Sequence, residues 1–141
     1  MDQKSIVELL ARSALFGSLE AQDRTAIAAR MRRVQFEPDQ MIFSRGDPGR
    51  EIYLVIEGRI RLSVLSSDGR ELSFDHAGPG NVFGEIATFD GGERTAGATA
   101  ISRVQAMSLP QRALTELIES NPKVAAAAIR FLCQRLRETD Q

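Results

Sequence analysis

Several residue types are scarce in this sequence of 141 residues, and each shortage excludes a class of protein. The single cysteine, Cys133, cannot form a disulfide framework within the chain or a four-cysteine metal site. The single histidine, His76, cannot supply the ligand set of a catalytic metal centre. The formal net charge of −1 provides no overall attraction to nucleic acid. The sequence also lacks an apolar run of about 18 residues, so we expect no membrane-spanning helix.

Other missing patterns narrow the function further. The N-terminal segment "MDQKSIVELL" has no signal-peptide hydrophobic region, which together with the lone cysteine predicts a cytoplasmic protein. The sequence shows no Ser/His/Asp arrangement and no nucleophile elbow, so we predict that the protein is not an enzyme. We expect His76 to be a satisfied turn histidine and Cys133 to be a small, buried apolar residue.

The two ends of the chain have helical patterns. A short helix is predicted over 5–12, where Ser5 and Glu8 have capping-box spacing, and Ser18 is expected to cap a second helix over about 19–31. The C-terminal region, about 111–140, reads as two helices. An amphipathic segment, "QRALTELIES", is followed by a cap at "NP" and a long stretch without a helix breaker.

The middle of the chain, about 33–110, has the pattern of short strands. Apolar runs alternate with turn signals, as in "RIRLSVL" followed by the hairpin signal "SSDGR". Strands at even spacing, without long helices between them, indicate a β-barrel or sandwich. The sequence therefore predicts an α+β protein with one domain over 1–141. Its centre is an antiparallel, jelly-roll-like β-roll, flanked by N-terminal helices and two C-terminal helices.

The most informative stretch is "FGEIATFDGGERTAGATA", in which Glu85 and Arg94 lie on either side of a glycine-rich loop. Such a pair can be an ordinary surface salt bridge, worth about 0–1 kcal/mol. It can also hold a small polar ligand with an anionic end. If the loop folds back, the guanidinium and the free N–H groups of a helical turn at 85–87 converge on one anion. Glu85 would then accept from a neighbouring hydroxyl, and Thr95, where we expect the next strand to begin, would add a donor. A 3′,5′-cyclic nucleotide has this shape.

The same stretch resembles the phosphate-binding cassette of cyclic-nucleotide-binding domains. That cassette begins with Phe-Gly-Glu, an apolar pair and a short loop. It ends with Arg, then one of Ser, Thr or Ala, and then Ala. Here these are "FGE", "IA" and "RTA". The segments "ALFGSL", "GPGNVFGE" and "LIESNPK" extend the resemblance over nearly the whole chain, which is most similar to the effector half of Crp–Fnr bacterial transcription regulators.

This resemblance implies a set of binding residues and their roles. Glu85 would bind the ribose 2′-OH and Arg94 the cyclic phosphate, with backbone N–H groups near the start of the loop supporting the phosphate. Thr95 would contact the phosphate and the amino group of a syn guanine, and Thr139, with Asp140 beside it, would contact the purine. The implied ligand-binding residues are Gly84, Glu85, Ile86, Ala87, Arg94, Thr95 and Thr139.

The resemblance also implies a function. We expect a regulatory domain that binds a cyclic nucleotide, cAMP with cGMP as the second choice, and needs no further cofactor. Gly97 and Ala98 replace larger residues that are usual in the family, which leaves base selectivity open. The alternatives are a stand-alone or ligand-divergent effector domain, reading cGMP, cyclic di-GMP or no nucleotide, and the sensor domain of a channel or kinase.

The expected partners follow from the family as well. Phe131, Leu132 and Leu136 give the last helix an apolar side that either packs on the β-roll or pairs with its copy in a homodimer. We expect the homodimer. The sequence contains no DNA-binding module, so contact with DNA is expected only through a domain outside these residues, and no contact with membrane is expected.

Overall fold

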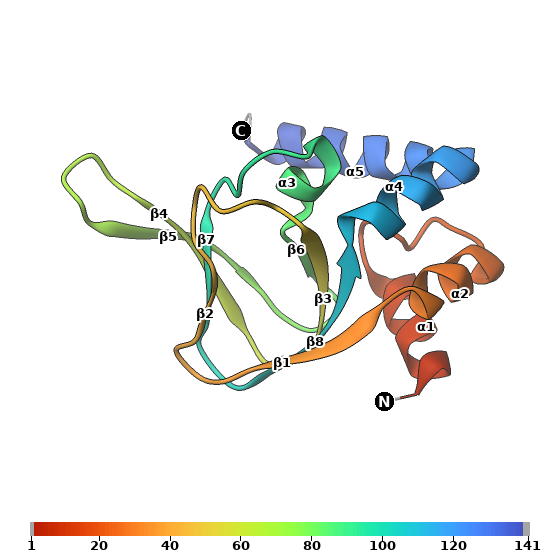
Figure 1. The fold of residues 1–141 in the computed structure, drawn as a ribbon, viewed down its shortest axis with the longest axis horizontal. Helices are drawn as coiled ribbons and strands as arrows, with labels where there is room; N and C mark the ends of the chain where they lie inside the picture. Colours follow the sequence, from red (N-terminus) through yellow and green to blue (C-terminus); the bar gives the residue numbers. More distant parts are fainter. Residues whose placement is uncertain (1, 140–141) are drawn as a thin grey trace. The chain divides into compact units, whose positions relative to one another are not determined.

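The computed structural model describes residues 2–139, which form two compact units (Figure 1). The β-unit comprises Met31–Gln111. The helical unit combines the chain up to Arg30 with the chain from Arg112 onward. The single domain expected over 1–141 remains a prediction.

The β-unit contains two four-stranded antiparallel sheets. The first sheet has the order β1 (Arg32–Phe36), β8 (Val104–Pro110), β3 (Glu51–Glu57) and β6 (Val82–Phe83). The second has the order β2 (Met41–Phe43), β7 (Gly97–Ala100), β4 (Ile60–Leu65) and β5 (Glu71–Ala77). A short helix, α3 (Glu85–Asp90), follows β6 directly. Eight antiparallel strands with helices before and after them confirm the predicted β-roll and the α+β class.

Both sheets contribute to one apolar core in the β-unit. Its members are Tyr53, Val55, Ile60, Ala77, Phe83, Ala98, Ala100, Val104 and Ala106. The run Ile52–Val55 is buried throughout, as expected of a strand that is covered on both faces. Strand β4 departs from simple alternation, because the polar Ser63 is buried. The pairing with β5 shifts register at this point, where Phe74 is an extra residue on β5.

The β4–β5 hairpin confirms the turn predicted from "SSDGR". Ser66 donates its N–H to the carbonyl of Arg70 at 2.7 Å, and Gly69 takes a φ of 85°, a value that a side chain would disfavour. Figure 1 shows this hairpin projecting from the rest of the β-unit. His76 lies on β5 opposite Arg61 and is exposed, so the prediction of a turn histidine is wrong. The strand continues one residue past it, to Ala77.

The helical unit contains α1 (Gln3–Arg12), α2 (Ala21–Ala29) and α5 (Pro122–Thr139), with α4 (Gln111–Ser120) starting at the last residue of the β-unit. None of these helices, within residues 2–139, is long and apolar enough to cross a bilayer. The predicted cap of α5 is confirmed, because Asn121 Oδ1 accepts the N–H of Lys123 at 3.0 Å and Pro122 occupies the first helical position.

The two N-terminal helices begin differently from the prediction. Asp2 caps α1 by accepting the N–H of Ser5 at 2.9 Å, so the helix starts two residues earlier than expected and Ser5 is not the cap. Ser18 does not cap α2, whose N-cap position is Glu20. The hydroxyl of Ser18 instead accepts a hydrogen bond from Arg130 at 3.2 Å.

Helix α5 places two predicted residues on opposite sides. Phe131 is buried, at 4% exposed. Cys133 is exposed, which contradicts the prediction of a buried cysteine. Two residues along an α-helix correspond to a rotation of about 200°, so burying Phe131 turns Cys133 outward.

Candidate functional site: a loop folded back around Arg94

The turn from β6 into α3 requires glycine. Gly84 has a φ of 80°, and a Cβ built on it would lie 2.7 Å from Nη1 of Arg94 and 3.3 Å from the carbonyl oxygen of Glu51. Its own carbonyl accepts the hydroxyl of Thr88 at 2.8 Å, which fixes the first turn of α3. The helical turn expected at 85–87 is therefore present as the start of α3, where the first N–H groups have no helical acceptor.

The loop after α3 folds back onto the turn between β2 and β3. Arg94 donates its N–H to the carbonyl of Asp47 at 2.7 Å, and its own carbonyl accepts the N–H of Gly46 at 2.9 Å. Gly49 donates to the carbonyl of Gly92 at 3.2 Å. This fold-back was a condition for the site expected from the sequence. The segment that the loop folds onto was not identified, although "RGDPGR" carries a clear turn signal. The next strand begins at Gly97, two residues later than the expected start at Thr95.

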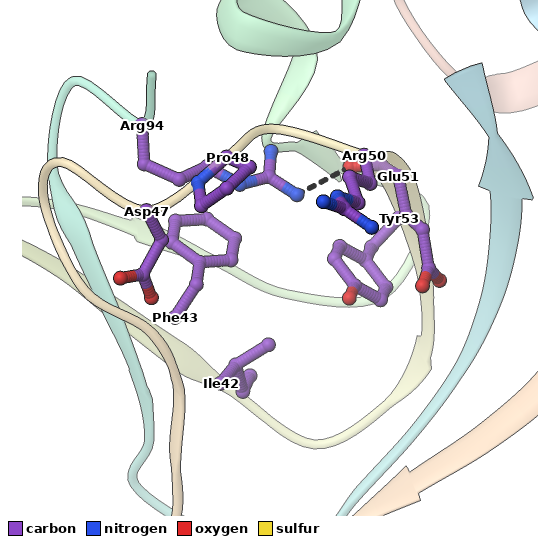
Figure 2. Close-up of a pocket in the computed structure, with 8 residues that line it drawn as sticks. All are labelled: Ile42, Phe43, Asp47, Pro48, Arg50, Glu51, Tyr53 and Arg94. Carbon is purple, nitrogen blue, oxygen red and sulfur yellow. Dashed lines mark hydrogen bonds between the residues drawn. The ribbon is translucent and has the colours of Figure 1, made fainter.

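These contacts hold the Arg94 side chain inside the β-unit. The residue is 5% exposed, and Nη1 donates to the carbonyl of Gly84 at 2.8 Å while Nη2 donates to that of Glu51 at 2.7 Å. Its guanidinium carbon lies 4.0 Å from the centre of the Phe43 ring (Figure 2). The third nitrogen, Nε, is buried and has no hydrogen-bond partner. A buried N–H without an acceptor is costly, so this atom is suited to an acceptor supplied from outside.

The charge of Arg94 persists in this setting. Burial lowers the pKa of the guanidinium, and the nearby Tyr53 and Glu51 oppose that shift. An arginine side chain starts from a pKa so high that it stays protonated in proteins. The β-unit therefore contains a fixed, largely desolvated cation.

A pocket of about 350 Å³ opens beside Arg94 (Figure 2). This volume lies within the usual range for small-molecule sites, about 300–1,000 Å³. Arg50, which is exposed, adds a second positive charge to its lining. The lining residues are Ile42, Phe43, Asp47, Pro48, Arg50, Glu51, Tyr53 and Arg94.

Of the predicted site residues near Arg94, Glu85 is the other buried charge, being 8% exposed. Because Glu85 and Arg94 are both buried, the alternative of a solvent-exposed salt bridge is wrong. Ala87 is buried against Gly49, whereas Ile86 and Thr95 are exposed.

The structure gives no test of the two C-terminal positions predicted to contact the purine. Thr139 is the last residue of α5, in the helical unit, and the predicted side-chain contact lies outside what the structure describes. Asp140 lies outside the described residues altogether.

Sequence reasoning missed the aromatic residues around Arg94. The rings of Tyr53 and Phe83 stack at 4.9 Å between centroids, and Phe43 lies 6.1 Å from Phe83 and 6.4 Å from Tyr53. Burial raises the pKa of Tyr53, so its hydroxyl is protonated at neutral pH. The only available signal was the apolar alternation of the strands, which predicts burial but does not say which ring meets the arginine.

A buried cation with an unused N–H, at the edge of a pocket in a β-roll, is the arrangement of a binding domain for a small anionic ligand. The sequence profile that describes the cyclic nucleotide-binding domain matches residues 33–121. The chain therefore belongs to the cyclic nucleotide-binding domain family, which is a family of binding domains rather than of enzymes.

Individual relatives place the chain within this family. It is 36% identical to the N-terminal domain of a transcriptional regulator from Streptomyces coelicolor A3(2), with a TM-score of 0.80, covering 94% of this chain and 92% of that one. It is 33% identical to the Thermus thermophilus catabolite activator protein, with a TM-score of 0.84 and coverages of 90% and 60%. These structures confirm the resemblance to the effector domains of Crp-like regulators.

A curated relative points the same way. The CRP-like cAMP-activated global transcriptional regulator of Mycobacterium tuberculosis strain H37Rv is 35% identical over 133 residues, which are 94% of this chain and 59% of that protein. The chain thus spans about three fifths of the length of that relative.

Proposed function

We propose that this chain is the cyclic-nucleotide-binding regulatory domain of a Crp–Fnr type transcription regulator, and that its ligand is cAMP. The observation that carries the proposal is the buried guanidinium of Arg94, whose Nε–H lacks an acceptor at the edge of a pocket. Two relatives support cAMP as the ligand: the cAMP-activated regulator of Mycobacterium tuberculosis and the cyclic AMP receptor protein of Thermus thermophilus.

The proposed binding mode divides the sugar-phosphate between two charges. Arg94 and the first N–H groups of α3, near Gly84, Ile86 and Ala87, bind the cyclic phosphate, because charge-assisted hydrogen bonds are the strongest available to it. The Glu85 carboxylate accepts the ribose 2′-OH, and Thr95 donates to the phosphate. The assignment of Thr139 to the purine rests on the family resemblance alone and remains a prediction.

A calorimetric titration against cAMP, cGMP and cyclic di-GMP tests the proposal. We expect one nucleotide per chain and tightest binding for cAMP, with the nucleotide recovered intact afterwards. Recovery of 5′-AMP would contradict a binding role. Tighter binding of cyclic di-GMP would indicate an effector domain that reads that ligand instead of cAMP. No heat with any of the three nucleotides would indicate an effector domain that binds no nucleotide.

Glu85→Gln tests the assignment of the ribose. Glutamine keeps the shape of the buried side chain but removes its charge, and a hydrogen bond to a charged group is worth about 1.5–3 kcal/mol. We expect cAMP binding to weaken by at least about tenfold. Binding of 2′-deoxy-cAMP, which lacks the hydroxyl, should change little between wild type and variant, and an equal loss for both nucleotides would refute the role of Glu85.

We further propose that the chain forms a homodimer through α5. Leu132 and Leu136 were predicted for this seam together with Phe131, which is buried and therefore not available at the surface. Ile129 takes its place, because Ile129 and Leu136 are 62% and 63% exposed and have heptad spacing with the half-buried Leu132.

The Ile129→Asp/Leu136→Asp double variant is expected to run as a monomer in light scattering, where the wild type runs as a dimer. Two charges in an apolar seam remove its burial energy. Glu119→Asp/Glu138→Asp, at exposed positions of α4 and α5, should leave the dimer intact. An unchanged mass for the double Asp variant would exclude this seam.

Two remaining elements of the proposal come from the relatives. Bacterial transcription regulators act on DNA in the cytoplasm, so we propose a cytoplasmic location for this chain. Contact with DNA is assigned to a domain outside these 141 residues.

A further inference from the structure

We infer that Phe43 is a positioning residue for ligand binding: its ring holds the guanidinium of Arg94 in place and leaves the charge and the free N–H donors of that guanidinium available to a phosphate. This inference rests on the proposed function, because it assumes that Arg94 binds the cyclic phosphate. Phe43 comes from β2, outside the loop that carries the predicted site residues.

Three contacts fix the plane of the guanidinium. Two edges donate to the carbonyls of Gly84 and Glu51, at 2.8 and 2.7 Å, and one face lies on the Phe43 ring, 4.0 Å from its centre to Cζ. Two in-plane hydrogen bonds alone would still allow the group to tilt about the line joining the two acceptors. The ring prevents that tilt, and it thereby determines where the unpartnered Nε–H lies.

The ring is itself fixed by the core. Phe43 pairs with Ala98 of β7 in one sheet, while its ring packs at 6.1 Å from Phe83 of β6 and 6.4 Å from Tyr53 of β3 in the other. The Tyr53 and Phe83 rings are nearly parallel to each other, at 15°. Since Phe83 immediately precedes the turn at Gly84, the same aromatic cluster places both Arg94 and the start of α3.

The chemistry of these contacts explains why a ring suits this position. A carboxylate against the guanidinium would neutralise its charge and occupy its N–H donors. The two carbonyls and the ring are neutral groups, and the ring attracts the cation through its quadrupole without accepting any N–H. The cation is therefore held firmly while its remaining donors stay available for an anion.

Fluorinated phenylalanines at position 43 separate this role from simple packing. The series Phe, 4-fluoro-Phe, 3,5-difluoro-Phe and pentafluoro-Phe progressively weakens the negative potential of the ring face with little change of shape. We expect the Kd for cAMP to rise stepwise, by about 3- to 30-fold in total, which is the range expected for a desolvated cation–π contact. Phe43→Leu, which removes the ring, should also weaken cAMP binding, whereas Phe43→Tyr, which keeps the ring, should retain it.

Phe36 is the matched control. Its ring packs edge-on against Tyr53, at 5.9 Å and 73°, in the same cluster, but Arg94 lies over the Phe43 ring. Fluorination of Phe36 should leave the Kd unchanged. An equal rise in Kd for both series would mean that fluorination disturbs the core in general, and it would overturn the positioning role.

A second readout on the nucleotide-free protein distinguishes this inference from the proposed function. In NMR spectra, the Arg94 Nε–H should be shifted by the ring current of Phe43 and exchange slowly with water, and exchange should quicken along the fluorinated series. If this holds but cAMP does not bind, the proposed function fails and the positioning by Phe43 stands. An exchange rate that stays constant along the series overturns the inference, whether or not the wild type binds cAMP. Where the wild type does bind cAMP, a constant Kd along the series overturns it as well.

Discussion

Replacing Arg94 with glutamine is expected to weaken cAMP binding by roughly 30- to 1000-fold, which corresponds to about 2–4 kcal/mol. Glutamine removes the buried cation at the edge of the pocket and with it the charge-assisted hydrogen bonds to the phosphate. Calorimetric titration of both proteins with cAMP measures this loss directly.

The control for Arg94→Gln is Arg103→Gln, which removes the same charge at an exposed position of the β-unit. That variant should bind cAMP like the wild type. Arg94→Gln also leaves the carbonyls of Gly84 and Glu51 without the guanidinium donors, so we expect a stability loss of about 1–3 kcal/mol in urea unfolding. A folded Arg94→Gln protein with near-unchanged affinity would refute the role assigned to Arg94.

Replacing Gly84 with alanine is expected to lower both affinity and stability. A φ of 80° costs an L-residue about 1–2 kcal/mol, and the added Cβ would lie 2.7 Å from Nη1 of Arg94. The guanidinium must then move, which displaces the phosphate donor. We expect the Kd for cAMP to rise by at least about tenfold, because even a modest shift breaks an aligned charge-assisted hydrogen bond.

Gly69→Ala isolates the backbone part of this effect. Gly69 has a similar φ of 85°, in the β4–β5 turn, but an added Cβ would meet nothing within 4 Å. We expect Gly69→Ala to lower the stability by about 1–2 kcal/mol and to leave cAMP affinity unchanged. If Gly84→Ala changed affinity no more than Gly69→Ala, close packing of the arginine against the turn would not matter for binding.

The sequence was sufficient to predict the parts of the site whose residues lie close together along the chain. Glu85 and Arg94 stand out because a carboxylate and a guanidinium around a glycine-rich loop have a chemical meaning without any tertiary information. The long-range part could not be predicted in this way. The loop folds back onto Asp47, and the arginine rests on Phe43, because strands distant in sequence are brought together by the β-roll.

The incorrect predictions have similar physical causes. Asp2, and not Ser5, is the N-cap of α1. Both residue types are favoured at an N-cap, so a polar segment that contains both does not show which of them begins the helix. The burial of the polar Ser63 breaks the apolar alternation of β4, and periodicity along one strand does not reveal the register shift in the neighbouring β5. Phe131 and Cys133 were assigned from an apolar pattern that did not fix which side of α5 faces inward.

A crystal structure of the chain grown with cAMP would show directly whether Arg94 binds the cyclic phosphate. We expect a phosphate oxygen within hydrogen-bond distance of Arg94 Nε, with the guanidinium still stacked on Phe43 and the ribose 2′-OH on the Glu85 carboxylate. A nucleotide bound elsewhere, with Arg94 Nε still lacking an acceptor, would contradict this binding mode.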